Sequence, residues 1–281
     1  MTLTITEGLD NWYSVTADVQ KKPLQSSIQL TFNHTSVKDM AFQDAADDAA
    51  IKFSQQHNNI YIGLSGGADS EFVAEVFYRN GIEFTPIVAS VPYSVEYMFA
   101  LEWCDRHQVK PIFMQFERND KRLVEQSFLS SKVVKQRCNL ITVVMYMANY
   151  VQELSGVLLT GESPLFRHTN SFHEAAGPVL DIHANVFYPR LTNPALPLYG
   201  FLMYTPELFL AMTREGDTTL NHSSAKCRLY NVPFRVKDGT PVPVIAEDVE
   251  EKLHQLLSIK DYCPLPALEW TKDELIGLLT R

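Results

Sequence analysis

Six small and polar residues, Ser65-Gly66-Gly67-Ala68-Asp69-Ser70, stand between an apolar stretch and a stretch with helical spacing. The two glycines would let the backbone approach an anion closely. The N–H groups at the start of the following helix would face that anion, and the serine hydroxyls could add donors. We therefore expect residues 60–72 to form a loop that binds a pyrophosphate group.

Asp69 differs from the rest of this loop because a carboxylate cannot donate a hydrogen bond to phosphate. Its expected role is to hold Mg²⁺, which prefers oxygen ligands and would neutralise a leaving group. The alternative interpretation of the loop is a glycine turn between strand and helix without a ligand. A phosphate loop of the Walker type is excluded, because the sequence contains no G-x-x-x-x-G-K-[ST].

The six residues fill every position of the pattern S-G-G-x-D-S, and the segment resembles the signature of the PP-loop, or N-type, ATP pyrophosphatases. Within that family the chain resembles the synthetase domain of asparagine synthetase most. The resemblance implies that ATP and Mg²⁺ bind, that a substrate oxygen attacks the α-phosphate, and that pyrophosphate leaves into the loop. It implies phosphate contacts from Ser65, Gly66, Gly67, Asp69 and Ser70. It places the adenine at the end of the second strand, beside Val88, Ala89 and Ser90.

Two side chains outside the loop complete the expected catalytic set with Asp69. Glu162 follows the apolar run 157–160, like a glutamate of the asparagine synthetase group, although Pro164 and Leu165 stand where further acidic residues would be expected. Glu162 is interpreted either as an active-site carboxylate or as a surface residue in the loop after the strand. Lys226 resembles a late lysine that contacts the phosphates, and its alternative is an ordinary solvated lysine.

Three clusters of polar residues receive weaker interpretations. Lys135, Gln136 and Arg137 could clamp a carboxylate or phosphate, but a solvated helix end is favoured. The histidines are spaced by five and ten residues and do not match a helical metal-binding pair; they are His168, His173 and His183. The four cysteines form no C-x-x-C pair and are expected to be reduced packing residues; they are Cys104, Cys138, Cys227 and Cys263.

From Asn59 onward, strand-like and helix-like segments alternate, which predicts a parallel sheet covered by helices on both faces. The expected strands cover 59–65, 84–90, 111–116 and 157–160. We predict an α/β fold with a doubly wound, parallel five-stranded sheet. The resemblance implies a Rossmann-like sheet of the HUP type, as in adenine nucleotide alpha-hydrolase-like proteins.

The chain is divided into three predicted regions. Residues 1–55 form an annex with a β-hairpin, from the runs 12–19 and 26–34, and a helix. Residues 56–235 form the PP-loop domain, in which Thr205-Pro206-Glu207 begins a helix. Residues 236–281 are mostly helical, with helices near 247–258 and 271–280.

Composition restricts the partners of the protein. With 281 residues, 46% of them hydrophobic and 20% charged, the chain can bury a large core, and no apolar run could span a membrane. The N-terminal residues do not read as a secretory signal, so a cytoplasmic location is expected. A net charge of −9 opposes binding to nucleic acid and favours a small-molecule substrate.

The resemblance, taken together with these features, implies an ATP-dependent ligase. It would adenylate a small molecule, release pyrophosphate, and form an amide or similar C–N bond with ammonia or an amine. Thr2 stands where glutaminase domains carry their nucleophilic cysteine, so ammonia is expected free or from a separate subunit. The annex could serve docking or homo-oligomerisation. The alternatives are a catalytically reduced ATP- or AMP-binding subunit and a sulfur-transfer or sulfonucleotide enzyme.

Overall fold

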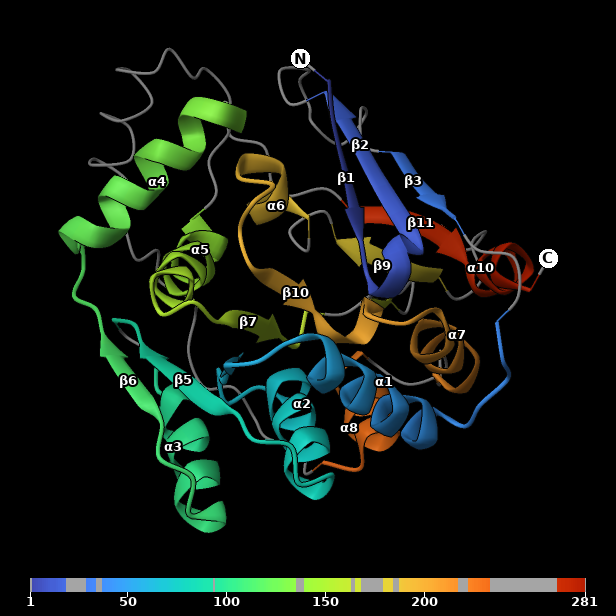
Figure 1. Cartoon of the computed structure of the whole chain (residues 1–281), viewed down its shortest axis with the longest axis horizontal. Coiled ribbons are helices and arrows are strands. Elements are labelled where there is room, and N and C mark those ends of the chain that lie inside the picture. The colour runs from blue at the N-terminus through green and yellow to red at the C-terminus, as the bar shows by residue number, and fades with distance from the viewer. Residues whose placement is uncertain are drawn as a thin grey trace, which may run out of the picture.

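A five-stranded parallel sheet forms the centre of the fold (Figure 1). The structure is a computed structural model that describes residues 2–18, 29–33, 37–92, 94–134, 139–162, 165–167, 179–183, 187–216, 222–232 and 267–280. In spatial order the strands are β10 (Leu198–Gly200), β7 (Val157–Thr160), β4 (Ile60–Gly63), β5 (Thr85–Ser90) and β6 (Ile112–Gln115). Each neighbouring pair is parallel, which confirms the predicted sheet.

Helices cover both faces of this sheet, because successive strand residues point to opposite sides and both sides are apolar. Ile62 on β4 packs in the same core as helices α1 (Phe42–Gln56) and α2 (Ala68–Arg79). Its neighbour Tyr61 packs on the other face, against a core that includes side chains of α4 (Lys121–Val134) and α5 (Asn139–Glu153). Helix α3 (Glu96–His107) packs on β5, on the face that α2 covers. Figure 1 shows α4 and α5 on one side of the strands and α1, α2 and α3 on the other.

The strand order contains a change of direction between β4 and β7. From β4 the chain proceeds outward to β5 and β6, then returns to the opposite side of β4 to form β7 and β10. In open parallel sheets of this kind, ligands bind beyond the carboxyl ends of the strands at such a switch point. The residues that follow β4 and β7 are therefore the first place to look for a site.

An antiparallel sheet precedes the central domain. The predicted hairpin is present as β2 (Tyr13–Asp18) and β3 (Gln29–Phe32), and β2 also pairs with β1 (Thr2–Glu7), a strand that the sequence analysis missed. A short 3₁₀ turn, η1 (Leu9–Asn11), connects β1 and β2. Trp12 donates its indole N–H to the carbonyl oxygen of Met203 at 3.0 Å, which ties this sheet to the central domain.

The second half of the chain adds helices and another antiparallel sheet. The helical elements are α6 (Tyr188–Thr192), η4 (Phe201–Met203), α7 (Pro206–Glu215), α8 (His222–Tyr230) and α10 (Lys272–Leu279). The sheet has the order β11 (Ala267–Thr271), β9 (Val179–His183), β8 (Leu165–Arg167), and none of its strands was predicted. The predicted helix starts near Thr205 and 271 are confirmed, and Thr205 caps α7 by accepting from the Leu208 N–H at 3.2 Å. The predicted helix near 247–258 lies outside the described residues, and the region boundaries at 55 and 235 stay predictions.

Within the described ranges, every helix is too short or too polar to cross a lipid bilayer.

Candidate phosphate-binding site

The expected pyrophosphate loop connects β4 to α2 at the switch point. Gly66 lies in the left-handed region with φ +83°, and a Cβ built there would stand 2.1 Å from the carbonyl oxygen of Glu96. Only glycine fits this position, since both the torsion and the contact with the backbone of α3 exclude a side chain. The backbone N–H of Leu64 donates to the carbonyl oxygen of Ile87 at 2.9 Å, which holds the loop against β5.

The two serines of the loop fix its shape through their hydroxyl groups. Ser70 accepts a hydrogen bond from the backbone N–H of Ser65 at 3.1 Å and donates to the carbonyl oxygen of Gly67 at 3.0 Å. The two serine Oγ atoms lie 3.0 Å apart. Gly67 is the N-cap of α2 and provides no capping side chain, as expected where a helix start receives an anion.

Two side chains of α8 bind the carboxylate of Asp69. The Lys226 ammonium contacts Oδ2 at 2.7 Å, and the Tyr230 hydroxyl donates to Oδ1 at 2.9 Å. Lys226 and Tyr230 are four residues apart and therefore lie on the same face of the helix. One helix thus holds both oxygens of the carboxylate that is predicted to lie at the phosphates.

The interpretation of Lys226 as a solvated lysine is wrong, because only 4% of the residue is exposed. A buried ammonium group requires a charged partner, and the Asp69 side chain supplies it while remaining 32% exposed. The pair is therefore asymmetric: the cation lies inside and the carboxylate reaches the surface. A role of Lys226 on the phosphates of a bound nucleotide stays a prediction.

Tyr230 was missed by the sequence analysis. Its ring stacks on Phe72 with a centroid distance of 4.6 Å and on Phe42 at 5.8 Å, so aromatic packing sets the position of its hydroxyl. The signal that could have revealed Tyr230 is its spacing of four residues from Lys226 on one predicted helix face.

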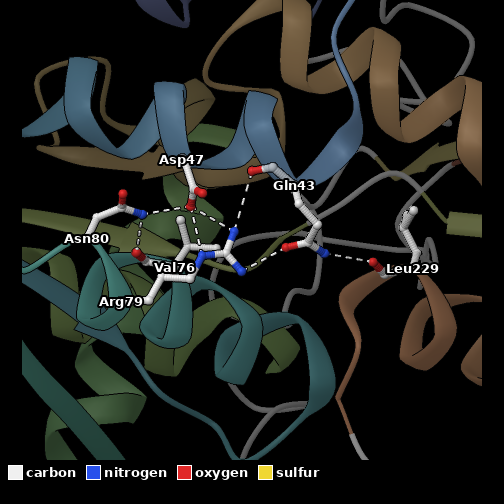
Figure 2. Close-up of polar contacts among 6 residues, drawn as sticks. All are labelled: Gln43, Asp47, Val76, Arg79, Asn80 and Leu229. Carbon is white, nitrogen blue, oxygen red and sulfur yellow. Dashed lines mark hydrogen bonds and ion pairs between the residues drawn. The ribbon is translucent and has the colours of Figure 1, made fainter.

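A polar network fixes α8 against α1 and α2, as Figure 2 shows. Its members are Gln43, Asp47, Val76, Arg79, Asn80 and Leu229. The Arg79 guanidinium on α2 donates to Asp47 at 2.8 Å and to the Gln43 side chain at 2.7 Å, both on α1. The Gln43 amide donates in turn to the carbonyl oxygen of Leu229 at 3.0 Å. Because Leu229 precedes Tyr230, this network anchors the end of α8 that contacts Asp69.

Glu162 lies beside the same carboxylate, at the end of β7. A Cβ added to the preceding Gly161 would stand 2.6 Å from backbone atoms of Asp69 and Ser70, so the two chain segments touch here. Burial raises the pKa of the Glu162 carboxyl, the charge of Asp69 raises it further, and Lys226 opposes both effects. The structure therefore gathers the three residues of the expected catalytic set, although the role of each stays a prediction.

The residues expected beside the adenine end the neighbouring strand. Gly63, the last residue of β4, pairs with Ile87, so Ala89 and Ser90 extend past β4 towards the level of the loop. Val88 is fully buried and packs in the core against α3. Adenine binding at Ala89 and Ser90 stays a prediction.

Asp69 also meets the chemical requirements of a magnesium ligand. Mg²⁺ usually binds proteins through one or two carboxylates and completes its octahedron with phosphates and water. The Asp69 carboxylate accepts hydrogen bonds from Lys226 and Tyr230, and a carboxylate has about four lone-pair directions in all. Among the described residues, no group of three or more His, Cys, Asp or Glu side chains is placed to hold a metal by itself.

The remaining sequence candidates contribute less. Lys135, Gln136, Arg137, His168 and His173 lie outside the described residues, as do Cys138 and Cys263, and the side chain of His183 is likewise not described. Neither Cys104 nor Cys227 forms a disulfide bond with a described residue. Burial raises the pKa of Cys227, and the charges of Asp69 and Glu71 add to that effect, which disfavours a thiolate nucleophile beside the loop.

No protein-family model matches the sequence, and no curated protein matches it. Among solved structures, the chain is similar to the NMN synthetase from Francisella tularensis, with 16% identity over 86% of this chain and 93% of that one and a TM-score of 0.37. It is also similar to the NH3-dependent NAD synthetase from Campylobacter jejuni subsp. jejuni in complex with the nitrate ion, with 16% identity over 43% of this chain and 56% of that one and a TM-score of 0.28. Because both TM-scores are below 0.5, the fold rests on the strand order and register given above.

Proposed function

We propose that this protein is an ATP-dependent synthetase that cleaves ATP between the α- and β-phosphates. It would adenylate a small-molecule substrate and then form an amide or similar C–N bond with ammonia or an amine. The observation that carries the proposal is the loop Ser65–Ser70 at the switch point of the sheet, with Asp69 and Lys226 paired at its end. A Rossmann-like sheet alone would not support this function, because that fold serves many reactions.

The loop would bind the β- and γ-phosphates. The N–H groups at the start of α2 point out of the helix end, and the close approach permitted by Gly66 leaves backbone rather than side chains facing the anion. When a substrate oxygen attacks the α-phosphorus, the bond to the bridging oxygen breaks and the electron pair moves onto pyrophosphate. Donors fixed around the departing group stabilise that charge without reorganisation, because the Ser65 and Ser70 hydroxyls already hold the loop in shape.

The charged residues divide the remaining work. Asp69 would hold Mg²⁺, which when bound neutralises charge on the phosphate oxygens. Lys226, whose ammonium group contacts Asp69, would bind the same oxygens as a point charge. Glu162, which lies next to Asp69 at the end of β7, would act on the acceptor substrate. The acceptor molecule, a separate ammonia-supplying subunit, homo-oligomerisation and a cytoplasmic location are predictions from the sequence.

The proposal is tested by incubating the protein with α-labelled ATP, Mg²⁺, ammonium and pools of carboxylic acids, amino acids and nucleosides. The expected labelled product is AMP, formed only when the correct pool is present. Release of ADP would contradict cleavage at the α-phosphate. Tight ATP binding without AMP from any pool would instead favour the catalytically reduced nucleotide-binding subunit.

Asp69→Asn is the informative variant for this assay, and Asp105→Asn is its matched control. Asp105 is an exposed carboxylate on α3. AMP formation should fall by at least a hundredfold in Asp69→Asn, since removing a charged group that acts on the transition state costs about 2.7 kcal/mol or more. Asp105→Asn should retain full activity. Full activity in Asp69→Asn would exclude the role assigned to Asp69.

A further inference from the structure

A small, largely enclosed cavity lies behind Glu162, between the N-terminal sheet, α6 and the ends of β7 and β10. Its volume is about 10 Å³, which is close to the minimum for one water molecule. The polar part of its wall consists of Glu7, Tyr13, Thr160, Glu162 and Arg190. A cavity this small can hold one small ligand and no organic substrate.

Two of these residues, Glu7 and Tyr13, come from neighbouring strands of the N-terminal sheet. Glu7 and Tyr13 stand opposite each other in the antiparallel ladder of β1 and β2, so their side chains share one face of the sheet. Only 6% of Glu7 and 3% of Tyr13 is exposed. Arg190 from α6 donates to Glu7 at 2.7 Å and closes this side of the cavity.

Among the described residues, none is a hydrogen-bond partner of the buried Tyr13 hydroxyl. Buried hydroxyls are normally paired. Tyr13 lines the cavity together with Glu7 and Arg190, and the charges of both residues act on its hydroxyl. A buried hydroxyl without a hydrogen bond lowers the stability of the folded state by about 1–3 kcal/mol, so a ligand that binds this hydroxyl would recover part of that free energy.

The charges around the cavity leave one carboxyl group unbalanced. Lys226 is paired with Asp69, and Arg190 is paired with Glu7. Within the described part of the chain, Glu162 has neither an ion pair nor a hydrogen bond of its own. Arg190 and Glu7 neutralise each other, so an ionised Glu162 would give the cavity one net negative charge, which favours a cation over water.

We propose that this cavity is a binding site for one desolvated monovalent cation of ammonium or potassium size, held between Glu162, Glu7 and the Tyr13 hydroxyl. Both ions are about as large as a water molecule, and both accept coordination by carboxylate and hydroxyl oxygens. The N-terminal sheet then supplies a wall of the site rather than a separate module. This inference does not depend on ATP cleavage, because the ion would bind in the absence of nucleotide.

Thermal unfolding of the full chain tests the site, with ammonium, potassium and choline chloride compared at equal ionic strength. Choline is too large to enter, so its effect measures salt alone. A bound ion stabilises the folded state in proportion to ln(1 + [L]/Kd), so the melting temperature should rise with the logarithm of ammonium or potassium concentration. A higher melting temperature in ammonium chloride alone would show that the site selects a hydrogen-bond donor. A higher melting temperature in both ammonium and potassium chloride would show that it selects cations by size. Equal curves in all three salts would overturn the proposal.

Tyr13→Phe locates the effect, and Tyr78→Phe, at an exposed tyrosine, is the matched control. In choline chloride the Tyr13→Phe variant should be at least as stable as the wild type, since it loses a hydroxyl without a partner among the described residues. In the stabilising salt it should lose most of the ion-specific rise, whereas Tyr78→Phe should keep all of it. An unchanged rise in Tyr13→Phe would place the ion elsewhere and overturn the proposal.

Thallium(I) provides a second readout, because it replaces potassium and ammonium and scatters anomalously. Crystals soaked in thallium(I) should show an anomalous peak between Tyr13 and Glu162. A peak only at other positions, or an ordinary water in the cavity, would contradict the assignment. No part of these tests requires turnover, so failure of the proposed synthetase activity would not be confused with failure of this site.

Discussion

The ion pair between Asp69 and Lys226 should respond unequally to the loss of either partner. Lys226 has a side chain that is 5% exposed, whereas that of Asp69 is 32% exposed. Replacing Asp69 with asparagine leaves a buried ammonium group without its counter-charge. Replacing Lys226 with methionine leaves a carboxylate that water can reach and that Tyr230 still hydrogen-bonds.

The expected magnitudes follow from this difference in burial. Removing one partner of a buried pair costs roughly 3–5 kcal/mol, and Asp69→Asn should lie near the lower end, about 3 kcal/mol, because Glu162 remains close enough to attract Lys226. Lys226→Met should cost about 1 kcal/mol or less, since methionine fills the space and removes a desolvated charge. The double variant should be more stable than Asp69→Asn alone, because no uncompensated cation remains.

Urea unfolding at pH 7 measures these differences as free energies of unfolding, with Asp105→Asn as the control for a carboxylate at the surface. The slope of the free energy against urea should stay constant, so that midpoints report stability. The reasoning would be refuted if Lys226→Met were as costly as Asp69→Asn, or if the double variant were the least stable of the three.

Three further predictions concern neighbouring residues. Tyr230→Phe should lose about 1.5 kcal/mol in urea unfolding, because it removes a hydrogen bond to a charged group and keeps the ring packing, whereas Tyr78→Phe should be neutral. Gly66→Ala should lower the free energy of unfolding by more than about 2 kcal/mol and weaken ATP binding in a filter assay, because the added Cβ would clash with the backbone of α3. A Cβ added at Gly277 in α10 meets nothing within 4 Å, so Gly277→Ala should raise the free energy of unfolding by roughly 0.5–1 kcal/mol. Burial raises the pKa of Cys104 to about 11, so its thiol should resist iodoacetamide at pH 8.5 in the folded protein. Because the folded state favours the protonated thiol, the stability that Cys104 contributes below about pH 9 should be lost as the pH rises towards 11. Rapid native labelling of Cys104, seen by peptide mass spectrometry, would contradict its burial, and a Gly66→Ala variant with normal stability would contradict the loop geometry.

The sequence predicted the central elements because their signals are local. The strands at β4, β5, β6 and β7 are short apolar runs bounded by turn residues, and the glycine turn before α2 carries its own chemical signature. These elements alone place the loop at the carboxyl edge of the sheet.

The missed strands lack such local signals. The fifth sheet strand, β10, has only three residues within a stretch rich in proline and tyrosine, and it is a strand because Leu198 to Gly200 pair with β7. Likewise β9 and β11 pair across more than eighty residues of sequence. Their existence depends on tertiary pairing, which periodicity in one segment cannot show.

The candidate site was predicted in part for the same reason. Asp69 is recognisable from its loop, but its partners come from α8, about 160 residues later. The burial of Lys226 depends on the packing of α8 against α2, and the cavity behind Glu162 depends on Glu7 and Tyr13 at the start of the chain. No pattern within one segment could have joined these three regions.

The most direct test of the phosphate-binding loop is a crystal structure with Mg²⁺ and α,β-methylene-ATP, an analogue that cannot be cleaved at the proposed bond. We expect the β- and γ-phosphates to lie against the backbone of Gly66–Ser70 at the start of α2, with Asp69 on the metal and the α-phosphorus open to a substrate oxygen on the side of Glu162. A nucleotide bound elsewhere, or a triphosphate that does not contact this loop, would contradict the proposed function.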